Sequence, residues 1–150
     1  MSASSVVMLP YAPSSVAAAR QRLGAELLAA GLIDSSVDDV VLVMSELLSN
    51  ALRHAHPLPC GHLQVAWTCS DTQIEIAVSD GGAHTEPRAG RPTLSSLGGR
   101  GLGIVEYLAD RWGVRHDDHS TTVWAVVTAA WEGRNSRNGA TGIPALREVG

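Results

Sequence analysis

The sequence predicts an α+β fold, a two-layer sandwich in which a mixed, mostly antiparallel sheet carries its helices on one face. The expected order of elements is strand, helix, helix, hairpin, loop, helix, hairpin. Strands and helices therefore do not alternate as a parallel doubly wound sheet requires. The chain has 150 residues, which suits one domain with its own core. Its hydrophobic content of 45% and charged content of 17% are typical of a globular domain.

The chain opens with a strand and a helix. Residues 5–9, "SVVML", form a β-branched run that Pro10 ends, which indicates a first strand. After the turn "PYAP", Ser14 or Ser15 is expected to cap a helix that ends near Gly31.

A second helix is expected after "DSS", where Ser36 and Asp39 resemble a capping box. The prolines of "HPLP" end it, because proline cannot continue the hydrogen-bond ladder. Apolar residues recur in it at steps of three and four, which predicts one wide buried stripe. The stripe contains Val40, Val41, Met44, Leu47, Leu48, Ala51, Leu52 and Ala55.

The middle of the chain predicts a hairpin, a loop and a helix. Residues 62–70 and 73–80 are both strand-like, and Asp71-Thr72 reads as the turn between them. Residues 81–99 are rich in Gly, Pro, Ser and Arg without periodicity, so we expect a long loop that is mobile until phosphates bind. A helix is expected over "RGLGIVEYLADRW", residues 100–112.

The chain is expected to close with a hairpin and a tail. "WGVRHDD" and "TTVWAVVTAA" read as its two strands. The remainder, residues 133–150, reads as a flexible tail, so the predicted domain spans residues 1–132.

Composition excludes several classes of protein. The net charge of −4 argues against a nucleic-acid or anionic-membrane partner. The sequence contains no lysine, which excludes P-loop and Schiff-base chemistry. Cys60 and Cys69 have no metal-type or redox-type spacing. No signal peptide or membrane span is recognisable, so we expect a reduced, soluble, cytoplasmic protein.

Three stretches carry residues suited to chemistry, and the first is on the second helix. Glu46, Asn50 and His54 follow one another at intervals of four, so they form a narrow polar row along the helix. The alternative interpretation is the solvated face of an amphipathic helix.

The second stretch is "VSDGG", where Asp80 ends a strand and two glycines follow. It is either an ordinary turn or a carboxylate held at the rim of the sheet beside open backbone. The third is "GGRGLGI", in which Gly98, Gly99, Gly101 and Gly103 lead into a helix whose N–H groups suit an anion. Its spacing and its place after a long loop exclude a Rossmann site.

In this order the three stretches resemble the GHKL ATPase superfamily, whose nucleotide site has the Bergerat fold. "ELLSNALRHA" looks like its N box, "DGG" like its first glycine box and "GGRGLGI" like its second. The resemblance runs from about residue 5 to about residue 130, and it is strongest to small ATP-binding regulators related to anti-sigma-factor serine kinases.

The resemblance implies ATP and Mg²⁺ as cofactors and gives roles to residues of the N box. Asn50 is the expected Mg²⁺ ligand, because Mg²⁺ prefers hard oxygen ligands. Glu46 is the expected general base. Arg53 and His54 either contact phosphate or support the helix.

The resemblance also implies a base pocket and a phosphate cradle. Asp80 is expected to accept from the adenine amino group, Gly82 to leave room for the purine, and Thr122 to join the adenine network. The cradle is expected to use the side chain of Arg100 and the glycine-rich backbone around it. That backbone set contains Gly98, Gly99, Gly101, Leu102 and Gly103.

The implied activity is a serine/threonine protein kinase that phosphorylates an anti-sigma antagonist and so regulates transcription through a sigma factor. The alternative is a silent, nucleotide-dependent binding module, because Ala83-His84 follows Gly82 and the second glycine of the usual box is missing. Ser120-Thr121 likewise replaces the Gly-Lys common in the family. The implied partners are the antagonist, the sigma factor or both, with homodimerisation as a family trait.

A metal hydrolase is a third, weaker interpretation. It would use His54, His56, Cys60 and His62, whose spacing matches no closed zinc pattern.

Overall fold

The fold is seen in a computed structural model that describes residues 3–82 and 102–133. The expected loop beyond Gly82, the glycine-rich segment up to Gly101 and the tail from residue 134 lie outside the described residues. Their predicted mobility and flexibility therefore stay predictions.

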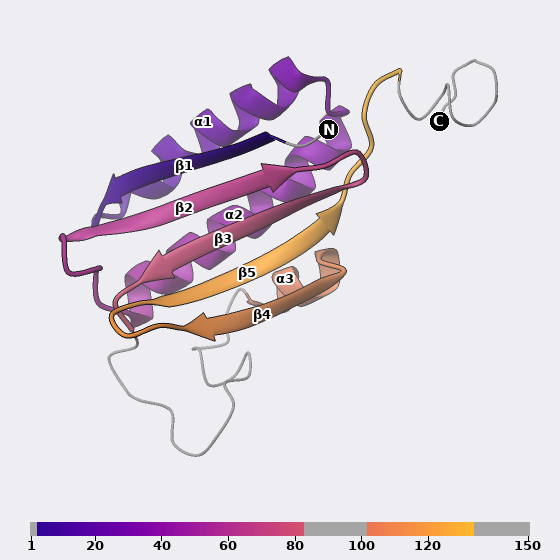
Figure 1. The fold of residues 1–150 in the computed structure, drawn as a ribbon. Coiled ribbons are helices and arrows are strands. Elements are labelled where there is room, and N and C mark those ends of the chain that lie inside the picture. The colour runs from indigo at the N-terminus through magenta and orange to yellow at the C-terminus, as the bar shows by residue number, and fades with distance from the viewer. Residues whose placement is uncertain (1–2, 83–101, 134–150) are drawn as a thin grey trace.

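The described residues form one sheet of five strands in the order β1-β2-β3-β5-β4 (Figure 1). Every pairing in it is antiparallel, so the expectation of a mixed sheet is wrong in that detail. The sequence places most connections in hairpins, and hairpins give antiparallel neighbours. The strands are β1 Ala3–Pro10, β2 His62–Cys69, β3 Gln73–Asp80, β4 Arg111–His116 and β5 Thr121–Thr128.

The helices α1 Ser14–Ala30, α2 Asp34–His54 and α3 Leu102–Leu108 all lie behind the sheet in Figure 1. This confirms the predicted two-layer α+β sandwich with helices on one face. No helix in the described part of the chain is long and apolar enough to cross a membrane.

The core lies between α2 and the central strands. Alternate residues of β3 point toward the helices, because side chains of a strand alternate between its two faces. Ile74, Ile76 and Val78 on that face are at most 1% exposed, and so is Trp67 of β2. From α2, six of the eight predicted stripe residues are buried, and Val41 and Leu52 are half-buried beside them. The periodicity of α2 therefore predicts its buried face correctly.

The ends of α1 show where sequence signals succeed and fail. Gly31 adopts φ 100° at the C-terminal end, and the N–H of Leu32 donates to the Leu27 carbonyl at 3.0 Å, which confirms the predicted stop. The predicted serine cap is wrong, because Pro13 occupies the cap position. Ser15 instead donates its hydroxyl proton to the Pro10 carbonyl at 2.6 Å.

The capping box predicted for α2 is also wrong. The helix begins at Asp34, one turn earlier than expected, and its cap residue Ile33 makes no side-chain cap bond. Ser36 lies inside the helix, where its hydroxyl oxygen accepts from the N–H of Ala130 at 3.0 Å. Tertiary contact with the chain beyond β5 therefore uses the hydroxyl that local sequence assigns to capping.

The helix expected up to residue 112 is shorter. α3 ends at Leu108 and β4 begins at Arg111. Asp110 breaks the helical ladder because its N–H donates to the Val126 carbonyl of β5 at 2.8 Å, and its carboxylate accepts from Thr128. Pairing with β5 thus overrides the helical pattern.

Candidate functional site

Two of the three predicted stretches meet where α2 ends. The N–H of Gly81 donates to the His56 carbonyl at 2.7 Å, and the N–H of His56 donates to the Gly82 carbonyl at 2.8 Å. These two backbone bonds hold the turn after β3 against the end of α2. Asp80 and the N-box helix are thereby fixed in one region of the molecule.

This contact depends on a glycine that sequence reasoning did not single out. A Cβ on Gly81 would lie 2.1 Å from the carbonyl oxygen of Pro57, and that oxygen belongs to backbone that cannot rotate away. Gly82 follows with φ 105°, a conformation that residues with a Cβ rarely adopt. The two glycines have different purposes: the first allows close approach, and the second turns the chain.

Asp80 is a buried carboxylate, only 5% exposed, on the helix-facing side of β3. Its Oδ1 accepts from the Gly82 N–H at 2.7 Å. Within residues 3–82 and 102–133, no donor to its Oδ2 is recorded. Burial raises the pKa of Asp80 to about 6, although the Gly82 N–H and the charge of His116 act in the opposite direction. An acceptor of this kind suits a ligand that brings an N–H donor.

The threonine beside Asp80 is Thr121, not the predicted Thr122. Asp80 pairs with Thr121 across the β3–β5 ladder, and directly opposed residues point to the same face. Thr122 pairs with Ser79 on the opposite face, where their hydroxyls are hydrogen-bonded at 2.7 Å. The strand register decides this, and sequence does not specify it for two adjacent threonines.

The N-box residues are more buried than a solvated helix face would be. Asn50 is only 8% exposed, so the solvated-face interpretation is wrong for it. Its Oδ1 accepts from the guanidinium of Arg53, a long contact of 3.5 Å. Glu46 and His54 are half-buried on the same side of α2, while Arg53 is exposed.

The donor set at Asn50 fits Mg²⁺ held jointly with phosphates. Asn50 has an amide oxygen of the kind that Mg²⁺ accepts as a ligand, and Glu46 lies one helical turn earlier. Mg²⁺ typically takes one or two protein oxygens and fills its other positions with water and phosphate. The structure does not gather His54, His56, Cys60 and His62: within its described part, no three His, Cys, Asp or Glu residues could hold a metal together. The hydrolase interpretation is therefore wrong.

The third predicted stretch is only partly described. Gly98, Gly99, Arg100 and Gly101 lie outside the described residues, so the phosphate cradle stays a prediction. Leu102 begins α3 and its side chain is 1% exposed in the core, which leaves only its backbone for a ligand. Gly103 is exposed on α3, and α3 packs against α2.

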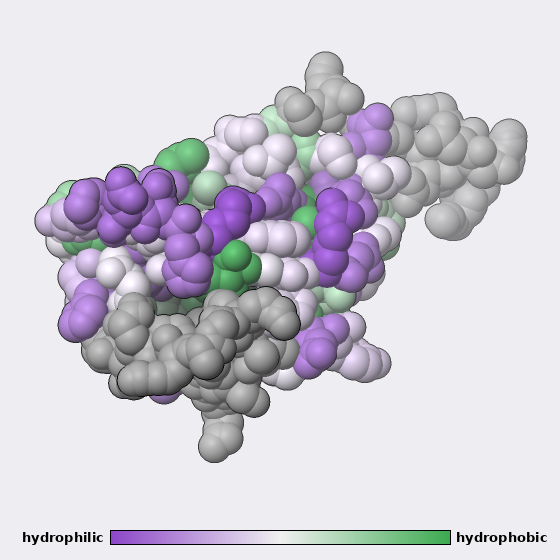
Figure 2. Space-filling view, turned by 60° about the horizontal axis from the view of Figure 1, so that its bottom comes forward, coloured by the Kyte–Doolittle hydropathy of each residue, from purple (hydrophilic) through white to green (hydrophobic). Residues whose placement is uncertain are grey.

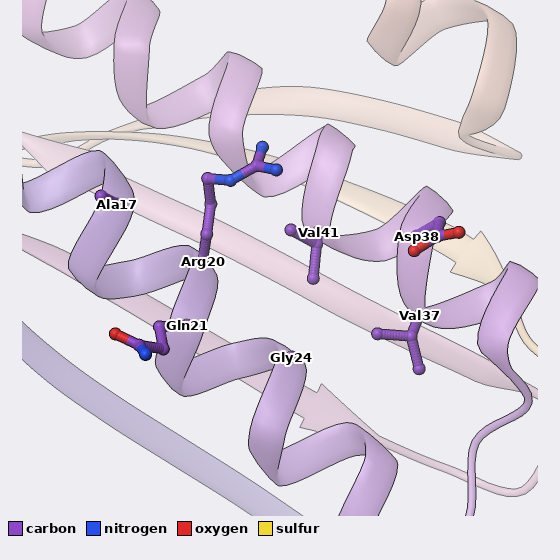
Figure 3. Close-up of a pocket in the computed structure, with 7 residues that line it drawn as sticks. All are labelled: Ala17, Arg20, Gln21, Gly24, Val37, Asp38 and Val41. Atoms are coloured by element: carbon purple, nitrogen blue, oxygen red, sulfur yellow. The ribbon is translucent and has the colours of Figure 1, made fainter.

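A groove of about 400 Å³ lies between α1 and α2 (Figure 3). None of the predicted site residues lines it. Arg20 extends from α1 toward α2, and its Nη1 donates to the hydroxyl of Ser45 at 3.0 Å. That bond ties α1 to the residue before Glu46, so the groove borders the N-box helix from the side away from the sheet.

One family description, histidine kinase-like ATPase domain, matches residues 9–127. The chain belongs to this family. The match covers β2, β3 and β4, β5 up to residue 127 and only the last two residues of β1, and it includes Glu46, Asn50 and Asp80. It confirms the resemblance to the GHKL superfamily, and membership of an ATPase family implies that the chain binds ATP.

A solved structure shares the fold. The crystal structure of the RsbU and RsbW domains of Rv1364c from Mycobacterium tuberculosis matches with a TM-score of 0.66 at 20% sequence identity. The match covers 85% of this chain and 32% of that chain, so this chain spans about a third of that length. At this identity the likeness shows the fold alone. Among curated proteins, none matches this chain.

Proposed function

We propose that this protein is an anti-sigma-type serine/threonine kinase that uses Mg-ATP to phosphorylate an anti-sigma antagonist. One observation carries the proposal: backbone hydrogen bonds hold the Asp80 turn against the end of the helix that bears Glu46 and Asn50. Family membership and the overall fold support it. The protein would act in the cytoplasm and regulate transcription through a sigma factor.

The base end of the site would recognise adenine through Asp80. Its Oδ1 accepts from the Gly82 N–H, so its Oδ2 would accept from an exocyclic amine, and Gly82 leaves the adjacent backbone without a side chain. A buried carboxylate discriminates well here, because a base without the amine leaves the charged acceptor unpaired.

The phosphate end would use the N box. Mg-ATP, when bound, would supply the γ-phosphoryl group, and its metal ion would offset the negative charge of the phosphates. Asn50 would hold the metal through its amide oxygen. Glu46, four residues earlier on the same face, would take the proton from the attacking hydroxyl. Arg53 and His54 at the end of α2, with Arg100 and the neighbouring glycines, would contact phosphate.

The kinase activity is testable by transfer of label from radiolabelled ATP to a purified antagonist protein. We expect Glu46→Gln to lower transfer by about 100-fold or more, because general bases contribute 10²–10⁴-fold, while ATP binding is retained. Glu106→Gln, at an exposed position on α3, is the matched control and should transfer normally. Asn50→Ala should abolish the increase in ATP affinity that Mg²⁺ causes in the wild-type protein.

The second candidate is a nucleotide-dependent binding module that sequesters its partner without phosphate transfer. The observation in its favour is Ala83-His84, which stands where the family usually has the second glycine of the box. ATP-dependent partner binding with no labelled antagonist and no released phosphate would favour this function over the kinase.

A further inference from the structure

His116 lies in line with Thr121 and Asp80, on a strand that contributes no predicted site residue. It is the last residue of β4, opposite Thr121 of β5, which in turn lies opposite Asp80 of β3. Three neighbouring strands thus present these side chains in one row on the same face of the sheet. Figure 2 shows the side of the molecule that lies lowest in Figure 1, where β4 forms the edge, as hydrophilic areas separated by small apolar ones.

The row is connected by a hydrogen bond. Nδ1 of His116 lies 3.2 Å from the hydroxyl oxygen of Thr121. That hydroxyl lies close to the turn, since a Cβ placed on Gly82 would be 4.0 Å from it.

A hydroxyl has one proton and two lone pairs, and its rotation decides where they point. A fixed partner on one side removes that freedom. When the Thr121 hydroxyl donates its proton to Nδ1 of a neutral imidazole, only its lone pairs are left, and these can accept from a ligand N–H beside Asp80 and Gly82. A threonine hydroxyl without such a partner could rotate freely, so it would not discriminate between a ligand donor and a ligand acceptor.

We propose that His116 is a positioning residue of the base pocket, which orients the Thr121 hydroxyl so that the pocket prefers a purine with an exocyclic amine. This inference rests on the proposed nucleotide site and adds to it a residue outside the three predicted stretches.

The experiment is a calorimetric titration of the intact chain with Mg-ATP and with Mg-ITP, whose base has a carbonyl where adenine has the amine. In His116→Ala we expect affinity for ATP to fall about three- to tenfold, as for the loss of one hydrogen bond, with ITP affinity unchanged. His116→Asn should restore most of the ATP preference, because its amide oxygen can accept from the Thr121 hydroxyl in the place of Nδ1. His119→Ala, exposed on the β4–β5 turn, should behave as wild type.

A double-mutant cycle with Thr121→Val tests whether His116 acts through the hydroxyl. Removing His116 in the Thr121→Val background should have no further effect on the ATP-to-ITP ratio. Three outcomes would overturn this inference and leave the proposed function intact. They are additive effects of the two substitutions, equal losses of affinity for ATP and ITP, and an unchanged ATP-to-ITP affinity ratio in a His116→Ala protein whose urea midpoint is that of the wild type. Failure of the wild-type chain to bind ATP would overturn the proposed function, and this inference with it.

Discussion

Replacing Asp80 by asparagine should stabilise the protein at neutral pH while it removes nucleotide recognition. The carboxylate is 5% exposed, and burial raises its pKa from the ordinary value of 3.8 to about 6. The native state therefore binds the proton more tightly than the unfolded chain does. Asparagine keeps the shape, and its amide oxygen can still accept from the Gly82 N–H, but it carries no charge to bury.

The sign and the size follow from linkage. Below pH 3.8 both states are protonated, and the raised pKa has no destabilising effect. As pH rises from about 3.8 to about 6 the unfolded state ionises first, so the free energy of unfolding falls, and above that range the loss is constant. This rise in the pKa of Asp80 lowers the free energy of unfolding by about 3 kcal/mol, because each pKa unit corresponds to about 1.4 kcal/mol.

The assay is urea unfolding of the wild-type protein and Asp80→Asn at pH 4, 5.5 and 7.5. We expect similar stability at pH 4 and an advantage of about 3 kcal/mol for the variant at pH 7.5. Asp118→Asn, on the exposed β4–β5 turn, controls for the removal of one negative charge. The reasoning would be refuted if the difference between the wild type and Asp80→Asn did not grow with pH.

The same variant separates stability from function. Asparagine offers the amine an N–H or a neutral oxygen in place of a charged acceptor, so Asp80→Asn should bind ATP about 10-fold more weakly or worse. A variant that gains stability and loses binding is the expected behaviour of a residue retained for its ligand.

Two glycine positions give further predictions. Gly81→Ala should destabilise by about 3 kcal/mol, because its Cβ would meet the Pro57 carbonyl and break the two backbone bonds of the turn. Urea midpoints check this against Gly24→Ala, a helical position with room for a Cβ, where a gain of about 0.5–1 kcal/mol is expected. Gly113→Ala should cost about 1 kcal/mol and change tryptophan fluorescence, since its Cβ would lie 2.6 Å from the movable Trp124 indole. Unchanged urea midpoints for Gly81→Ala would contradict the packing of the turn. Unchanged fluorescence for Gly113→Ala would contradict the close approach of the Trp124 indole to Gly113.

Much of the fold could be predicted because its signals are local and periodic. Ile74, Ile76 and Val78 alternate with polar or small residues, and the structure has β3 at the predicted residues 73–80. The steps of three and four in α2 predicted which side faces the sheet. Signals that compete with tertiary hydrogen bonds failed: Ser36 bonds to Ala130 and does not cap, and Asp110 bonds to β5 and does not continue the helix.

Some residues of the candidate site could be predicted from local sequence, and others could not. Asp80 and Asn50 were recognisable from their places in the motifs, because each motif is contiguous. Thr121, Gly81 and His116 were not, since their significance depends on which residues of other elements lie opposite or against them.

By itself the sequence determined the order of the elements, their buried faces and the family, because residue type and periodicity act over a few neighbouring positions. Only the tertiary structure decided which threonine lies beside Asp80, why Gly81 must be a glycine and that His116 reaches the same row. Strand register and backbone approach between distant segments set these relations, and no short stretch of sequence encodes them.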